Sequence, residues 1–165
     1  MSQTLGIHLV KSAFGQWLPG DERGHWSTAW DDKIGHVEPH MLHEGDPARH
    51  RMAAERMQHP PVRWTPGIIE SITATLRRCA DESPWDLAAL AVEPTHLHAL
   101  LTYAPLNVDR TAKWLAQQIT KAVHTDTPHT GPVFAKGKWA TFVFEQTHWD
   151  NTVRYIQRHP GAVPL

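Results

Sequence analysis

The sequence predicts an α+β fold in which helices cover one antiparallel sheet, and three observations support this prediction. Two long stretches, 65–81 and 107–124, repeat apolar residues with the 3.6-residue period of an amphipathic helix. Two apolar runs, 85–93 and 96–103, are separated only by a tight break at Pro94-Thr95, as in antiparallel strands. Further strand-like runs lie at 6–14 and 133–144.

Length and composition are those of an ordinary globular protein. The 165 residues, 41% hydrophobic and 20% charged, predict a single domain over 1–165. Apolar runs stay well short of the roughly 20 residues of a membrane helix, and the N-terminus lacks a signal-peptide layout. The one cysteine, Cys79, is expected to be packed in a reducing compartment, and we therefore expect a cytoplasmic protein. A net charge of −1 argues against a large basic surface for duplex DNA but leaves room for a local groove.

The chain opens on a strand predicted for 6–14, in which Ile7, Leu9 and Val10 are the candidates for burial. The next segment, 15–24, contains three glycines and a proline, which predicts a structured loop. This loop either lines a ligand groove or covers the edge of the sheet.

Residues 25–63 predict a long insertion of irregular structure. Within it, 47–59 is predicted to form a short polar helix that ends at Pro60. His36, His40 and His43 have helix-like spacing, but a proline interrupts them, which favours scattered solvated histidines over a second metal site.

Both long helices have recognisable starts. Thr65 caps the first, and Pro66 occupies its first position. Either Asn107 or Asp109 caps the second, which runs to about His124. The apolar stripes consist of Ile68, Ile69, Ile72, Leu76 and Cys79 on the first helix and Val108, Ala112, Leu115, Ile119 and Val123 on the second.

A last short helix is predicted over 148–158, with Trp149, Val153 and Ile156 apolar. The order of elements is therefore β-α-β-β-α-β, the ferredoxin-like pattern, extended by an N-terminal insertion and a C-terminal helix. In this arrangement the first and third strands are central neighbours, so 96–103 is expected in the middle of the sheet.

His96 and His98 alternate with Leu97 and Ala99 in the third strand. Side chains two residues apart leave a strand on the same face, so both imidazoles aim at one place. Such a pair is half of a metal site. Glu93, just before this strand, is expected to be exposed at the end of the second strand rather than to act as a ligand or base.

Tyr155 is one of two tyrosines, and His159 follows it by four residues, so both lie on one face of the last helix. If that face covers the sheet near His96 and His98, three imidazoles and a phenol converge. A metal can polarise a phosphoryl oxygen, and a phenol becomes an effective nucleophile once it is positioned and polarised. His8 and His148 can lie nearby, but neither is predicted to take part.

The segments 94–101 and 155–160, in that order, resemble the HUH single-tyrosine transposase superfamily, which includes the REP-associated tyrosine transposases. The stretch 133–149 and the loop 15–24 are also similar, and the resemblance is weakest over 25–63. It implies metal-dependent nicking and strand transfer on single-stranded or hairpin DNA through a 5′-phosphotyrosine intermediate. By this resemblance Tyr155 is the catalytic nucleophile, and His96 and His98 bind a divalent ion, Mg or Mn.

Two positions depart from the pattern of this superfamily. Relatives usually have Asn or Gln where this chain has His159, and Asn is common at the position of Thr95. With His159 as the third ligand, a three-imidazole site favours Mn, Co, Ni or Zn over Mg. The change either gives a working variant of the site or marks a chain that has stopped cleaving DNA.

Basic and aromatic side chains in two regions are candidates for holding DNA. A polar stripe on the helix 107–124 suits a phosphate backbone, although an ordinary solvated face is the alternative. A hairpin turn predicted at 136–139 adds charge and a stacking surface. The candidate DNA-binding residues are Arg110, Lys113, Gln117, Lys121, Lys136, Lys138 and Trp139.

The leading prediction is therefore a DNA-nicking and strand-transfer enzyme, and the resemblance adds a second copy of the chain as a partner. Two alternatives stay open. A domesticated module of the same fold would bind hairpin DNA without cutting it. A metal-dependent hydrolase would use His96, His98 and His159 with a bound water.

Overall fold

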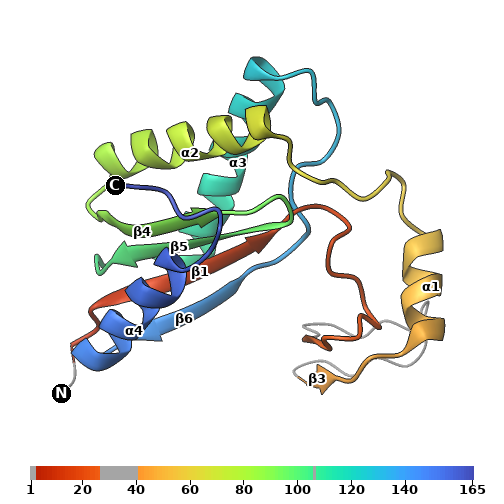
Figure 1. The fold of residues 1–165 in the computed structure, drawn as a ribbon, viewed down its shortest axis with the longest axis horizontal. Coiled ribbons are helices and arrows are strands. Elements are labelled where there is room, and N and C mark those ends of the chain that lie inside the picture. The colour runs from red at the N-terminus through yellow and green to blue at the C-terminus, as the bar shows by residue number, and fades with distance from the viewer. Residues whose placement is uncertain (1–2, 27–40, 106) are drawn as a thin grey trace.

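The computed structural model describes residues 3–26, 41–105 and 107–165, and its main feature is a four-stranded antiparallel sheet (Figure 1). The strands are β1 (Gly6–Ser12), β4 (Leu87–Val92), β5 (His96–Thr102) and β6 (Trp139–Val143). Their order across the sheet is β4-β5-β1-β6, with every neighbouring pair antiparallel. The first and third of these strands are central, so the predicted α+β, ferredoxin-like arrangement is confirmed.

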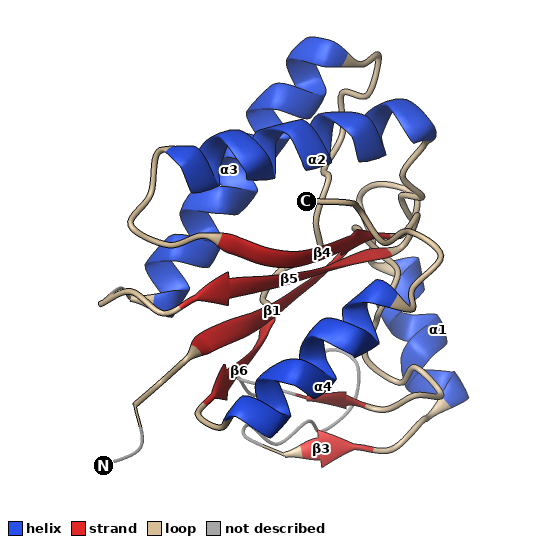
Figure 2. Cartoon of the chain, turned by 60° about the vertical axis from the view of Figure 1, so that its left-hand side comes forward, coloured by secondary structure: helices blue, strands red, loops and turns tan. Residues whose placement is uncertain are grey.

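Helices cover both faces of the sheet (Figure 2). One face carries α2 (Pro66–Asp81) and α3 (Val108–Asp126), and the other carries α4 (Gln146–Gln157). The Thr65 side chain accepts a hydrogen bond from the Ile68 N–H and caps α2, as predicted. Of the two candidate caps for α3, Asn107 fills the position and accepts from the Arg110 N–H. Within the described residues, no helix is long and apolar enough to cross a membrane.

The alternation of side chains along β5 supplies two separate hydrophobic cores. Leu97, Ala99 and Leu101 pack in the larger core, toward α2 and α3. Leu100 packs in the smaller core with Ile156 of α4. His96 and His98 share the parity of Leu100, so they face the side of the sheet that α4 covers.

Small residues let α4 approach the sheet closely. Ala89 and Ala91 of β4 belong to the core beneath this helix. A Cβ on Gly6 of β1 would lie 2.5 Å from the ring of Trp149 and 2.3 Å from the Leu101 carbonyl oxygen. The helix that carries Tyr155 therefore packs directly against the strands.

The described residues of the N-terminal insertion form a smaller lobe beside the sheet (Figure 1). In it, β2 (His25–Trp26) pairs with β3 (Leu42–His43), and α1 (Pro47–Glu55) begins after the capping side chain of Asp46. The predicted polar helix is confirmed but ends four residues early. His36 and His40 lie outside the described residues, and the His43 ring stacks on His25 at 5.1 Å.

The loop 15–24 is held by contacts among its own residues. The Arg23 guanidinium lies over the Trp17 ring, 4.2 Å from its centroid, and forms a salt bridge of 2.7 Å with Asp21. Gly15, Gly20 and Gly24 all have positive φ angles of 75° to 87°, which L side chains adopt rarely. The prediction of a structured loop is confirmed.

The predicted hairpin at 136–139 is wrong. Phe134 bridges to Ala13, just beyond β1, and β6 begins at Trp139 and pairs with β1 itself. Both segments thus pair with the first strand and its extension, and the residues between them form a loop in which Gly137 has a φ of 79°. Local turn residues cannot distinguish a hairpin from such an interruption of one strand.

Candidate metal and tyrosine site

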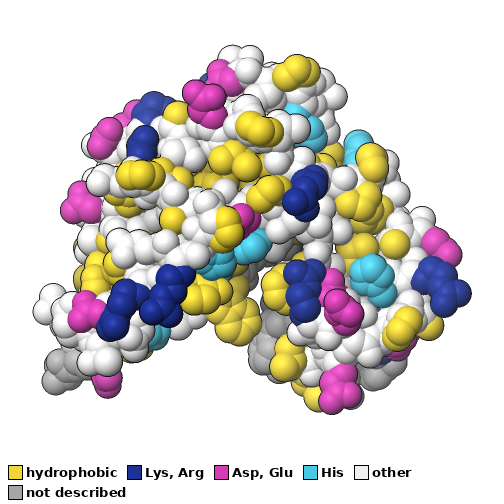
Figure 3. Space-filling view, viewed as in Figure 1, with side chains coloured by type: hydrophobic (Ala, Val, Ile, Leu, Met, Phe, Trp, Pro, Cys, Tyr) yellow, Lys and Arg dark blue, Asp and Glu magenta, His cyan; other side chains and the backbone are white. Residues whose placement is uncertain are grey.

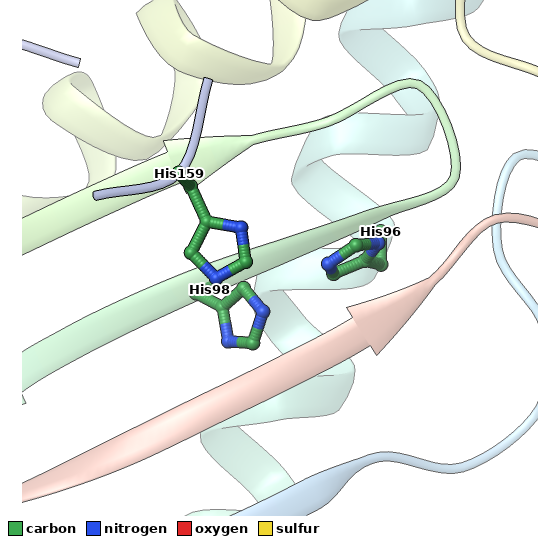
Figure 4. Close-up of side chains that lie close together, drawn as sticks. All are labelled: His96, His98 and His159. Carbon is green, nitrogen blue, oxygen red and sulfur yellow. The ribbon is translucent and has the colours of Figure 1, made fainter. Parts of the chain in front are cut away.

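Three imidazoles meet on the sheet face that α4 covers. His96 and His98 stand on β5, and His159 lies in the segment that follows α4 and points back toward them (Figure 4). One ring nitrogen from each lies within 4.8 Å of the others. The structure therefore brings together the three residues that the sequence suggested as metal ligands.

The two strand histidines each have one ring nitrogen occupied by the protein. The Nδ1 of His96 lies 3.0 Å from the Thr95 hydroxyl oxygen. The Nδ1 of His98 lies 3.0 Å from the Nε2 of His8, on the neighbouring central strand. Partners of this kind fix the tautomer and orientation of a metal-binding imidazole, so Nε2 is the atom that each of these rings would offer to an ion.

His159 follows the same pattern through Glu93. Its Nδ1 lies 3.5 Å from Glu93 Oε1, while its Nε2 is buried and has no hydrogen-bond partner. A buried polar atom without a hydrogen-bond partner destabilises a protein unless a ligand or an ion binds to it. The three imidazoles therefore fit a metal ion through their Nε2 atoms.

The electrostatics of the cluster keep its strand imidazoles neutral. Burial, followed by His8, His96 and His159, lowers the pKa of His98 to about 3. Burial and His159 lower the pKa of His96, and burial, His148 and His159 lower that of His8. The neutral imidazole is the form that binds a metal, so these residues need no deprotonation at neutral pH.

Tyr155 completes the arrangement from α4. Its ring centroid lies 5.4 Å from that of His98, 5.0 Å from that of His159 and 6.2 Å from that of His8. The side chain is 51% exposed, so an external substrate can reach the phenol. His159 itself lies just past the helix, in a turn where its N–H donates to the Ile156 carbonyl.

Glu93 corrects the expectation of an exposed strand end. Its side chain is only 15% exposed, and Oε1 accepts a hydrogen bond of 2.8 Å from the Gly161 N–H. The cause is the C-terminal segment, which returns along the free edge of β4 and pairs Ala162 with Ala91. The sequence of Glu93 alone does not reveal this, because the covering chain comes 68 residues later.

His8 is a site residue for which the sequence predicted no part, although it was expected to be able to lie nearby. It belongs to the cluster through its hydrogen bond to His98, and the two rings stack with centroids 5.2 Å apart. The signal that could have found it is the pairing of the two central strands, which sets His8 opposite Leu100, next to His98 along β5.

The candidate DNA-binding residues do not share one surface. Those of α3 are exposed on the helix that covers the opposite face from the histidines; they are Arg110, Lys113, Gln117 and Lys121. Lys136 is exposed in the loop before β6, and Lys138 forms a salt bridge with Asp109 at the start of α3. Trp139 differs, because its strand partner Val10 is also the partner of His98, which places it on the site face.

Comparisons with known proteins add two structural likenesses. No family model and no curated sequence matches the chain. A solved REP-associated tyrosine transposase bound to a REP hairpin is 13% identical, with a TM-score of 0.44, over 94% of this chain and 67% of that one. A "putative transposase" from Deinococcus radiodurans R1 is 18% identical, with a TM-score of 0.46, over 95% of this chain and 92% of that one. Because both TM-scores lie below 0.5, neither likeness assigns an activity to this chain.

Proposed function

We propose that this protein nicks single-stranded or hairpin DNA and transfers the cut strand through a covalent bond to Tyr155. The observation that carries the proposal is the convergence of this phenol with His96, His98 and His159 on one sheet face. The resemblance of the motifs around these residues to the HUH single-tyrosine transposases supports DNA as the substrate.

The histidines would hold the divalent ion on which this chemistry depends. Three imidazole ligands favour Mn, Co, Ni or Zn over Mg, which prefers oxygen ligands. A bound ion would polarise a phosphoryl oxygen and offset the charge that develops on it. His8, Thr95 and Glu93 would keep the three rings in orientation through their contacts with Nδ1.

Tyr155 would supply the nucleophile. Its phenolic oxygen bonds to phosphorus while the bond from phosphorus to the 3′-oxygen of the preceding nucleotide breaks. The phenol loses its proton to solvent, which reaches the half-exposed side chain, and the leaving 3′-oxygen takes a proton from water. The 5′-phosphotyrosine keeps the energy of the phosphodiester, so a 3′-hydroxyl can reseal the strand without ATP.

Covalent capture of DNA tests this proposal. Labelled hairpin and single-stranded oligonucleotides are incubated with the protein and Mn, Co, Ni, Zn or Mg, and the products are separated on a denaturing gel. We expect a shifted protein–DNA band that disappears in Tyr155→Phe. Tyr103→Phe is the matched control, because Tyr103 is the other tyrosine and is 45% exposed.

The outcomes separate the competing functions. Nicking that survives Tyr155→Phe but disappears in His98→Ala would replace the covalent mechanism by hydrolysis with a bound water. DNA binding without any adduct, whatever the metal, would identify a non-cleaving module and refute the proposal.

A further inference from the structure

Trp139 is a large aromatic side chain that the fold leaves uncovered beside the candidate site. It opens β6, the edge strand of the sheet, and is 59% exposed. A single exposed apolar side chain is common on a protein surface, so its role depends on which residues surround it. What matters for Trp139 is therefore its position relative to the histidine cluster.

The strand register places Trp139 in line with the metal cluster. His98 pairs with Val10 across β5 and β1, and Val10 pairs with Trp139 across β1 and β6. Paired residues of antiparallel strands point to the same face, so all three side chains do so. Two strand spacings separate Trp139 from His98, or about 10 Å.

The indole is held in place by its neighbour on β6. Trp139 Nε1 donates a hydrogen bond of 3.1 Å to the Thr141 hydroxyl oxygen, and Thr141 pairs with His8. The only polar group of the ring is thus engaged within the protein. What the side chain offers to a ligand is its aromatic surface, which suits stacking rather than the reading of base edges.

Positive charge lies on the same side of the molecule. Arg154 lies on α4, and Arg158 is the first residue after the helix. Both flank Tyr155 in the sequence, and both are exposed. Figure 3 shows dark blue side chains over α4 next to cyan histidines, which border a hollow between the sheet and the lobe that contains α1. Arginines on the same face of the sheet as an exposed aromatic ring suit the phosphates and bases of a single strand.

We propose that Trp139 is a stacking platform for an unpaired base close to the phosphate that Tyr155 attacks. This inference rests on the proposed function for the identity of the strand. Stacked nucleotides repeat about every 3.4 Å along a strand, so the roughly 10 Å between the strand positions of Trp139 and His98 corresponds to two or three nucleotides from a phosphate held at the histidines. Because the indole N–H is engaged, the platform accepts all four bases with similar affinity.

Binding of single-stranded oligonucleotides to the Tyr155→Phe protein tests the platform without cleavage. We expect Trp139→Ala to weaken binding about 5- to 150-fold, the range for loss of one stacked base. Trp139→Phe should retain most of the affinity. Phe142→Ala is the matched control, because Phe142 is a 45% exposed aromatic on the same strand but faces the opposite side.

A series of oligonucleotides with one abasic position locates the base. We expect one abasic position to weaken binding to the Tyr155→Phe protein and to have no further effect once Trp139→Ala is added. The position should lie two or three nucleotides from the site of adduct formation in the parent protein. Thermal unfolding of each variant confirms that it is folded.

Several results would overturn the platform. These are unchanged binding in Trp139→Ala, an equal loss in Phe142→Ala, or no binding of single-stranded DNA by the parent. A shift from dimer to monomer in Trp139→Ala with unchanged DNA affinity would assign the ring to a protein interface instead. Adduct formation by the parent reports on the proposed function separately, so the two ideas can fail independently.

Discussion

The Nε2 of His8 and the Nδ1 of His98 lie 3.0 Å apart, which joins two residues that are 90 positions apart in the chain. The bond crosses the two central strands of the sheet, β1 and β5, and the rings stack beside it. If His98 donates through Nδ1, its Nε2 carries the lone pair that a metal needs. His8 is therefore placed to fix the tautomer and the direction of His98.

Removal of His8 should weaken metal binding without unfolding the protein. We expect His8→Ala to lower the affinity for Zn or Ni by about 10- to 100-fold, the usual effect of losing a partner of a metal-binding histidine. His8→Gln should recover part of the loss, because its amide can reach the His98 ring. Isothermal titration with each metal measures the change.

His129→Ala is the control for the loss of a histidine. His129 lies in the loop after α3, where its Nε2 contacts the Pro132 carbonyl oxygen. Equal affinities in the parent and His8→Ala would show that His98 is oriented by its strand alone.

The choice of metal should depend on His159. Its Nε2 is buried without a partner, and replacement by Gln would offer the cluster an amide oxygen instead of an imidazole. We expect His159→Gln to lower the affinity for Zn and Ni about tenfold or more and to improve Mg relative to both. Competition between metals, followed by a fluorescent chelator, gives the ratios. An unchanged order of metals would remove His159 from the ligand set.

The sequence was sufficient for features that depend on local periodicity. The spacing of His96 and His98 predicted a shared strand face, and the apolar stripe of each helix predicted its buried side. The order of elements then placed β5 in the centre of the sheet. Tyr155 and His159 were expected to meet the strand histidines if the last helix covered that face of the sheet, as α4 does.

Features that depend on distant parts of the chain were missed for one physical reason. The register between strands that no tight turn connects, and the return of a distant segment, depend on packing between segments rather than on the sequence of either one. The order of elements predicted that β1 and β5 are neighbours, but not the register that brings His8 beside His98. Glu93 is covered only because the C-terminal segment returns to β4. The loop at 136–138 likewise looked like a hairpin because its pairing partner lies near the N-terminus.

Gly161 should be needed for the position of His159. A Cβ at this residue would lie 2.3 Å from the Val92 carbonyl oxygen, and the Gly161 carbonyl accepts a hydrogen bond from the Val92 N–H. We expect Gly161→Ala to displace the C-terminal segment, to cost about 1–3 kcal/mol of stability and to weaken metal binding. Chemical denaturation and metal titration measure the two effects.

Gly67→Ala is the matched control, because a Cβ at Gly67 meets no atom within 4 Å. Gly67 lies in α2, where alanine favours the helix by up to about 1 kcal/mol. A Gly161→Ala variant with the metal affinity and stability of the parent would show that the segment after His159 does not hold the ligand.

Lys11 should make stability depend on pH in the alkaline range. Burial, and then the nearby Lys138, lowers the pKa of Lys11 to about 8, and its Nζ donates to the carbonyls of Ala135 and Gly137. The Lys11 ammonium lies over the Phe134 ring, and the other charged group near it is Lys138, which is paired with Asp109. Between pH 8 and about 10.4 the unfolded chain holds more protons at this residue, so the free energy of unfolding gains a contribution that rises with pH.

Lys11→Met should remove that rise, and denaturant unfolding of both proteins at pH 7.5 and 10 measures it. If the free energies of unfolding of the parent and Lys11→Met change in parallel between pH 7.5 and 10, the lowered pKa of Lys11 is contradicted.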